Sequence, residues 1–150
     1  MSVPFVRSAR WTAFGFSVLL MALSAISCAG FAAKGDAEAG VANFHQMLDA
    51  EKYADIYNTT DDLFKSATTA AQFSAILQLV HTKLGAVQSA TQTTFYSREE
   101  AGTNAGSYIS LTYDTAFVEG HATESFNWKV SDGKVHLAGY NIKSPLLSAR

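Results

Sequence analysis

The sequence predicts an α+β domain in which N-terminal helices pack on one face of a four-stranded antiparallel sheet. Apolar residues recur at three- and four-residue steps up to Leu84, and at every second residue from Val87 onward. The first period is typical of an amphipathic helix and the second of a half-buried strand. Helices grouped ahead of strands favour the α+β class over an alternating α/β arrangement.

The N-terminus has the pattern of a secretory signal peptide. Arg7 and Arg10 precede an uncharged stretch from Trp11 to Ile26, and small residues follow it. This stretch is shorter than the roughly 20 residues that a membrane-spanning helix needs, so a cleaved signal is favoured over a permanent anchor. We therefore predict a signal peptide over residues 1–27.

Cys28, the only cysteine, lies at the predicted cleavage point. Ser27 and Ile26 fit the pattern before a lipidated cysteine in bacterial lipoproteins, whereas Ala25 stands where leucine is preferred. The prediction is that Cys28 carries the lipid and anchors the chain to the membrane. Since Ala29 follows in place of aspartate, an outer-membrane lipoprotein facing the periplasm is expected. The alternative is an ordinary signal cleavage, which leaves a free thiol.

The remaining chain is long enough for one domain, and its composition excludes some functions. Without Arg7 and Arg10, nine basic residues face 13 acidic ones, a net charge of −4. This charge offers no basic face for nucleic acid. We expect a spacer at residues 28–35, the domain at residues 36–143 and a C-terminal tail at residues 144–150.

Three helical segments and a short turn are predicted within the domain. The first segment begins at Asp36, whose side chain would cap it, and breaks around Ala50; a second segment at residues 53–57 and a short turn at residues 63–66 follow. The next helix starts with a capping box at Thr69–Gln72 and stops at Gly85. Its apolar face consists of Phe73, Ile76, Leu77, Val80 and Leu84.

Four strands are predicted after Gly85, at residues 87–96, 109–117, 122–130 and 135–140. The dipeptide Asp132-Gly133 predicts a tight hairpin between the last two. The residues assigned to one face of the sheet are Ile109, Leu111, Tyr113, Thr115, Phe117, Ala122, Glu124, Phe126, Trp128, Val130, Val135, Leu137 and Gly139.

The helix end at Leu84-Gly85 and the closing segment from Trp128 to Tyr140 together resemble a known group of domains. The segment contains Asp132-Gly133 and Gly139-Tyr140. The resemblance is to small bacterial exported domains of unknown function, which look like the nuclear-transport-factor-2-like and cystatin-like superfamily. It covers roughly residues 39–142. It implies a strongly bent sheet wrapped around the helices, often as a cone with a cavity.

The same resemblance suggests catalytic candidates, because ketosteroid-isomerase-like and SnoaL-like members place an Asp or His in the cavity as a general base. Asp114 and His121 would fill that role here, with Tyr113 or Tyr140 as hydrogen-bond donor. The residue pattern speaks against it: Asp114 alternates away from the apolar face and His121 follows Gly120 in a turn. His45 and His81 are interpreted as surface or capping groups, and His136 alternates away from Val135 and Leu137.

The function predicted from the sequence is therefore a noncatalytic binding or scaffolding domain at the bacterial cell envelope. Its partners would be the membrane, through the lipid, and a small apolar ligand, a peptide or an envelope protein. No cofactor and no metal are expected, since the four histidines lack the spacing of metal ligands. A small cavity enzyme is the alternative, and homodimerisation through the sheet is a further one. Candidate cavity-lining residues are Tyr113, Phe117, Phe126, Trp128 and Tyr140.

Overall fold

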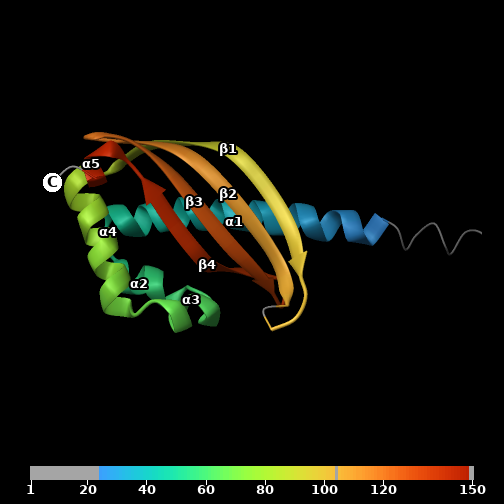
Figure 1. Cartoon of the computed structure of the whole chain (residues 1–150). Coiled ribbons are helices and arrows are strands. Elements are labelled where there is room, and N and C mark those ends of the chain that lie inside the picture. Colours follow the sequence, from blue (N-terminus) through green and yellow to red (C-terminus); the bar gives the residue numbers. More distant parts are fainter. Residues whose placement is uncertain (1–23, 104, 149–150) are drawn as a thin grey trace, which may run out of the picture. The chain divides into compact units, whose positions relative to one another are not determined.

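The computed structural model describes residues 24–103 and 105–148, and it confirms the predicted α+β class. Helices α1 (Ser24–Asp49), α2 (Tyr53–Asn58), α3 (Asp62–Ala67) and α4 (Ala70–Leu84) precede the sheet. The strands are β1 (Val87–Glu100), β2 (Gly106–Phe117), β3 (Gly120–Ser131) and β4 (Lys134–Lys143). A short α5 (Pro145–Ser148) ends the described chain (Figure 1). Residues 33–150 form one compact unit, and the packing below concerns this unit.

Helix α1 differs from its prediction at its start. It begins at Ser24, so Asp36 lies inside the helix instead of capping it, and the expected spacer at residues 28–35 is helical. Alanine is the strongest helix former, and the alanine-rich sequence here lets the helix extend toward the N-terminus. Most of the predicted signal peptide lies outside the described residues. None of the helices from residue 24 onward is long and apolar enough to cross a membrane.

Helix α4 confirms the predicted capping box. The Thr69 hydroxyl accepts a hydrogen bond from the Gln72 backbone N–H at 3.3 Å, and the Gln72 side chain accepts one from the Thr69 N–H at 3.0 Å. The helix ends at Gly85, whose φ of 74° is costly for residues with a side chain. The prediction that Ile76 lies on the buried face is wrong, because its side chain is 47% exposed. The buried stripe is narrower, consisting of Phe73, Leu77, Val80 and Leu84.

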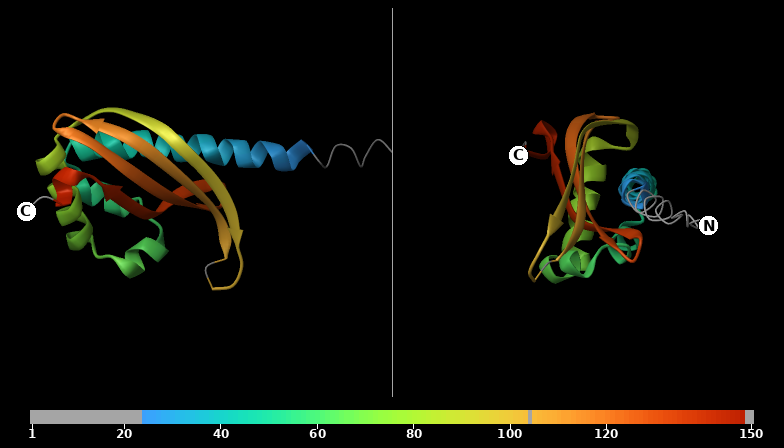
Figure 2. Two further views of the ribbon diagram at one scale, coloured as in Figure 1. Left: turned by 45° about the horizontal axis from the view of Figure 1, so that its top comes forward. Right: turned by 90° about the vertical axis from the view of Figure 1, so that its right-hand side faces the viewer.

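The sheet has the strand order β1-β2-β3-β4, with each neighbouring pair antiparallel. The four strands curve together (Figures 1 and 2). Asp132 and Gly133 both have positive φ, 51° and 71°, as a two-residue hairpin turn requires. Along β2 and β3 the predicted alternation holds: Leu111 and Phe126 are fully buried, and both lie on the face covered by the helices.

A β-bulge in β4 changes the phase of the last strand. Asn127 pairs with Gly139, but its neighbour Trp128 pairs with Leu137, so Ala138 is the additional residue. Leu137 is buried, and Tyr140, three residues later, pairs with Phe126 and packs against the same core. Simple alternation predicts Tyr140 on the opposite face from Leu137; the bulge places both side chains inward.

The two edge strands of the sheet, β1 and β4, differ in what lies against them. At β4, Thr60 forms a parallel bridge with Leu137, and the Asp61 N–H donates to the Leu137 carbonyl at 2.8 Å. The loop between α2 and α3 therefore covers this edge at Leu137. Among the described residues, β1 pairs with β2 alone, and most of its side chains are exposed.

Candidate functional site

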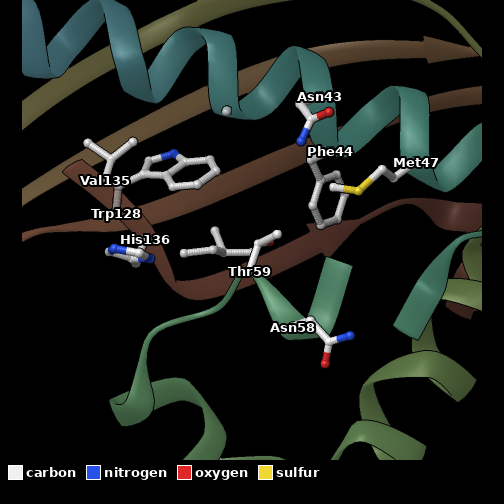
Figure 3. Close-up of a pocket in the computed structure, with 10 residues that line it drawn as sticks. Asn43, Phe44, Met47, Asn58, Thr59, Trp128, Val135 and His136 are labelled. Atoms are coloured by element: carbon white, nitrogen blue, oxygen red, sulfur yellow. The ribbon is translucent and has the colours of Figure 1, made fainter. Parts of the chain in front are cut away.

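A groove opens between α1, the end of α2 and the hairpin of β3 and β4. Its volume is about 350 Å³. Figure 3 shows the Trp128 ring and, further along, Phe44 and Met47, with Thr59 and Asn58 below them in the view. The lining residues are Gly40, Asn43, Phe44, Met47, Asn58, Thr59, Trp128, Val135, His136 and Leu137.

Because Gly40 has no side chain, it leaves space for the indole of Trp128 against α1. A Cβ atom at Gly40 would lie 2.6 Å from Cη2 of Trp128, so the ring packs directly on the helix backbone. The indole also stacks on Phe126, with ring centroids 6.4 Å apart and an interplanar angle of 14°. Trp128 is 6% exposed, and its buried Nε1 meets no hydrogen-bond acceptor among the described residues. A buried N–H without a partner is uncommon in proteins.

The groove is lined by apolar and uncharged polar groups, together with one histidine. None of the ten described lining residues is Asp, Glu, Lys or Arg. Phe44, Met47 and Trp128 provide apolar surface, while the amides of Asn43 and Asn58 can donate and accept hydrogen bonds. An apolar wall with a few polar groups, at this volume, is the common composition of small-ligand sites.

A buried carboxylate lies beside the groove, in the core between α1 and the sheet. Glu124 is 0% exposed. Its Oε2 accepts hydrogen bonds from Nε2 of His45 at 2.8 Å and from the Thr115 hydroxyl at 2.6 Å. Its Oε1 accepts one from the Tyr140 hydroxyl at 2.7 Å. We call these four residues the Glu124 cluster; they come from α1, β2, β3 and β4.

The Glu124 cluster is held by close hydrogen bonds, and its carboxylate is closed to solvent. Burial raises the pKa of Tyr140 well above its ordinary value of 10.0, and the charge of Glu124 and the hydrogen bond to it add to the effect. The phenol therefore stays protonated and donates. Since Glu124 has no exposed surface, a substrate has no access to its carboxylate. The arrangement can fasten α1 to three strands, as hydrogen bonds to a charged acceptor are about twice as strong as neutral ones.

Aromatic rings connect the Glu124 cluster to the groove. The Phe44 ring, which lines the groove, lies 4.8 Å from the ring of Tyr140 and 5.1 Å from that of Phe126, centroid to centroid. Phe126 in turn stacks on Trp128. The hydrogen bonds of Tyr140 and His45 thus help to set the position of two groove walls.

Of the five aromatic candidates from the sequence, Trp128 lines this groove. Phe126 is fully buried, and Phe117 and Tyr113 are 3% and 7% exposed, packed in the core. The Tyr140 hydroxyl is bonded to Glu124. The four residues other than Trp128 therefore support the walls of the groove or the core.

The two catalytic candidates lie together but away from the groove. His121 and Asp114 approach to 3.8 Å, with side chains 74% and 61% exposed. Tyr113 lies on the buried face of β2, the opposite face from Asp114. The enclosed acid-and-tyrosine arrangement that a cavity enzyme would need is not formed by these residues.

Sequence reasoning missed the role of two histidines and of Glu124. His45, interpreted from the sequence as a surface or capping group, is 7% exposed. Its position, with Val41, Phe44 and Leu48, follows the i, i+3, i+4, i+7 spacing of a buried helix face, which was the available signal. For Glu124, the signal was an acid among inward-facing Ala122, Phe126 and Trp128. His136, expected to point away from Val135 and Leu137, lines the groove with both.

Comparison with known proteins places this chain in a family whose function is not known. Among the described residues, no cluster of three or more His, Cys, Asp or Glu side chains could hold a metal ion. No curated protein matches the sequence. One family model, described as a protein of unknown function (DUF4019), matches residues 41–140, which include β1 to β3, most of β4 and most of the groove. The chain therefore belongs to the DUF4019 family.

Proposed function

We propose that this protein is a noncatalytic binding domain at the bacterial cell envelope, anchored through lipidated Cys28 and facing the periplasm. Its ligand is an uncharged, largely apolar small molecule or an uncharged side chain of a peptide. One observation carries the proposal: a groove of about 350 Å³ lined by neutral residues, with Trp128 in its wall. The amides of Asn43 and Asn58 can orient the ligand by hydrogen bonds.

The size of the groove sets the expected strength of binding. A ligand that buries about 200 Å² of apolar surface would gain about 5 kcal/mol from the hydrophobic effect. Much of this gain is offset by the loss of translational and rotational freedom on association. Binding by the isolated domain is therefore weak. Attachment to a membrane would raise the local concentration of the domain near membrane-bound partners.

The anchor is supported by the sequence around Cys28. Positive residues, an uncharged apolar stretch and a lone cysteine follow one another in the order found in lipoprotein signals. Mass spectrometry of the membrane fraction from cells expressing the wild-type chain or Cys28→Ser tests it. We expect an acyl mass increment on the mature N-terminus of the wild type and its loss in the variant. A wild-type mature N-terminus without added acyl mass would refute the anchor.

The groove is tested with an uncharged apolar fluorophore. The chain has two tryptophans, Trp11 and Trp128. In a full chain carrying Trp11→Phe, the tryptophan fluorescence therefore comes from Trp128 in the groove alone. We expect the probe phenylnaphthylamine to bind and to quench the emission of Trp128 by energy transfer. Filling the groove with Asn43→Phe should weaken binding about tenfold, a loss of about 1.4 kcal/mol.

The matched control is Gln46→Phe, which adds the same ring to an exposed position of α1 outside the lining. It should leave probe binding unchanged. Equal binding by Asn43→Phe and the unmodified chain would show that the probe binds elsewhere and would overturn the assignment of the groove. Native mass spectrometry of the protein purified from its membrane then identifies a retained ligand by its mass.

A further inference from the structure

The free edge of β1 has the features of a strand that pairs with another chain. Of the two sheet edges, β4 is covered at Leu137 by Thr60 and Asp61, while β1 is 14 residues long, mostly exposed and, within the described part of the chain, paired on one side alone. From Val87 to Ser97 it contains no charged residue and no proline. Proteins ordinarily protect an open edge with such residues, because unpaired backbone N–H and C=O groups recruit a further strand.

Two bulges limit where this pairing can occur. The register between β1 and β2 shifts between Val87 and Ser89 and again between Gln92 and Thr94. From Thr94 to Glu100 the register is regular over seven consecutive pairs. This regular segment can accept a neighbouring strand along its whole length, provided that the charges of Arg98, Glu99 and Glu100 at its end do not meet like charges.

We propose that the segment Thr94–Glu100 pairs antiparallel with the same segment of a second copy of this chain, centred on Ser97. In this register the two sheets join into one eight-stranded sheet about a twofold axis. No acid lies directly opposite another acid, and Arg98 does not lie opposite Arg98. The facing pairs are Ser97 with Ser97, Tyr96 with Arg98, Phe95 with Glu99, and Thr94 with Glu100.

The outer face of the sheet favours this register. Arg98 already lies over the ring of Tyr108, with its guanidinium carbon 5.2 Å from the centroid, and its Nε donates to Oε1 of Glu100 at 2.6 Å. Tyr96 is 58% exposed and lies on the same face as Arg98. In the pair, Tyr96 of one copy meets Arg98 of the other, so the guanidinium would be flanked by two tyrosine rings. Cation–π contacts of Arg with Tyr are attractive and become stronger as they are desolvated.

The inner face carries a cation beside an exposed ring. Lys34 of α1 lies 5.5 Å from the ring centroid of Phe95, which is 42% exposed, and it forms an ion pair with Glu38 of the same helix. In the proposed register, Glu99 of the second copy faces Phe95, so that Lys34 would lie between the carboxylates of Glu38 and of this Glu99. The apolar ring that is half exposed in one copy would be covered by the stem of Glu99 and by the second backbone.

A cysteine at the twofold axis tests the proposal. In the full chain with Cys28→Ser, the substitution Ser97→Cys introduces the only thiol. Directly opposed residues of antiparallel strands have Cα atoms about 4.5 to 5.5 Å apart, a range compatible with a disulfide. Under mild oxidation in detergent, we expect a disulfide-linked dimer to form about tenfold faster than with Thr91→Cys.

Thr91→Cys is the matched control, because Thr91 is exposed on β1 but lies outside the paired segment. A second variant, Arg98→Glu, should lower the dimer fraction measured by light scattering about tenfold, since it removes the cation from between the tyrosines. Three outcomes would each overturn the proposal: equal cross-linking rates for the two cysteine variants, a monomeric mass for the unsubstituted chain, or cross-linking of the Ser97→Cys variant to a different protein.

Discussion

Replacing Glu124 tests whether the Glu124 cluster fastens α1 to the sheet. Its carboxylate accepts three hydrogen bonds at 2.6 to 2.8 Å while completely buried. Glu124→Leu removes the acceptor and leaves three donors in the core, those of His45, Thr115 and Tyr140. A buried donor without an acceptor costs about 1 to 3 kcal/mol. Because the three losses are coupled and partly relieved by relaxation, we expect a total of about 4 kcal/mol.

Glu124→Gln separates the charge from the hydrogen bonds. The glutamine oxygen can still accept one donor, and its NH₂ group can donate to Thr115 Oγ1 or to a His45 ring nitrogen in the other tautomer. The variant therefore loses mainly the charge assistance, and we expect it to cost about 2 kcal/mol. The free energy of unfolding should fall in the order wild type, Gln, Leu.

The assay is equilibrium unfolding in urea of the compact unit Ala33–Arg150, followed by the fluorescence of Trp128, its only tryptophan. Glu119→Gln is the control, because it makes the same chemical change at an exposed position. Its unfolding free energy should match that of the wild type. If Glu124→Leu unfolds at the same urea concentration as Glu119→Gln, the cluster contributes nothing to stability and the reasoning fails.

Three further predictions concern packing, pH and a helix cap. Gly40→Ala should destabilise the domain by about 1 to 3 kcal/mol and shift the emission of Trp128, because the new methyl group overlaps the indole; Gly35→Ala, on the same helix with open space, should be neutral or stabilising. The raised pKa of Tyr140 means that the folded state holds its proton more tightly than the unfolded state. The contribution of this tyrosine to the free energy of unfolding is complete below about pH 10 and should fall above it by about 1.4 kcal/mol per pH unit. Urea unfolding at several pH values measures this slope, and Tyr140→Phe should remove it. Thr69→Ala should cost about 1 kcal/mol in the same assay, and no loss would show that the capping box does not stabilise α4.

The fold class and the element order could be predicted because they depend on local signals. The capping box at Thr69, the stop at Gly85 and the turn at Asp132-Gly133 each act within a few residues. The start of α1 could not be placed, because Asp36 has the properties of a cap and follows Gly35, whereas Ala32, Ala33 and Lys34 before them are good helix formers that let the helix continue toward the N-terminus. Whether Asp36 caps the helix or lies inside it depends on the residues before it, and its own capping preference does not decide between the two.

The candidate site was harder to predict because it depends on contacts between distant segments. Glu124 and His45 are 79 residues apart, and nothing local to either predicts the other. The groove joins α1, the end of α2 and two strands, so most of its lining residues have no shared sequence pattern. Alternation along β3 predicts that Trp128 faces inward, but inward-facing aromatic residues are common in both cores and cavities, so the sequence pattern does not separate the two.

The additional residue at Ala138 has a consequence for any alignment or redesign of this chain. Deleting it would leave the pairs of Trp128 with Leu137, Asn127 with Gly139 and Phe126 with Tyr140 in register, and would turn β4 into a plain alternating strand. Tyr140 would still face the interior, and Oε1 of Glu124 would keep its donor. A gap at position 138 should therefore be tolerated even where position 124 stays acidic, whereas a strand that keeps Ala138 but pairs without the bulge would turn Tyr140 to solvent.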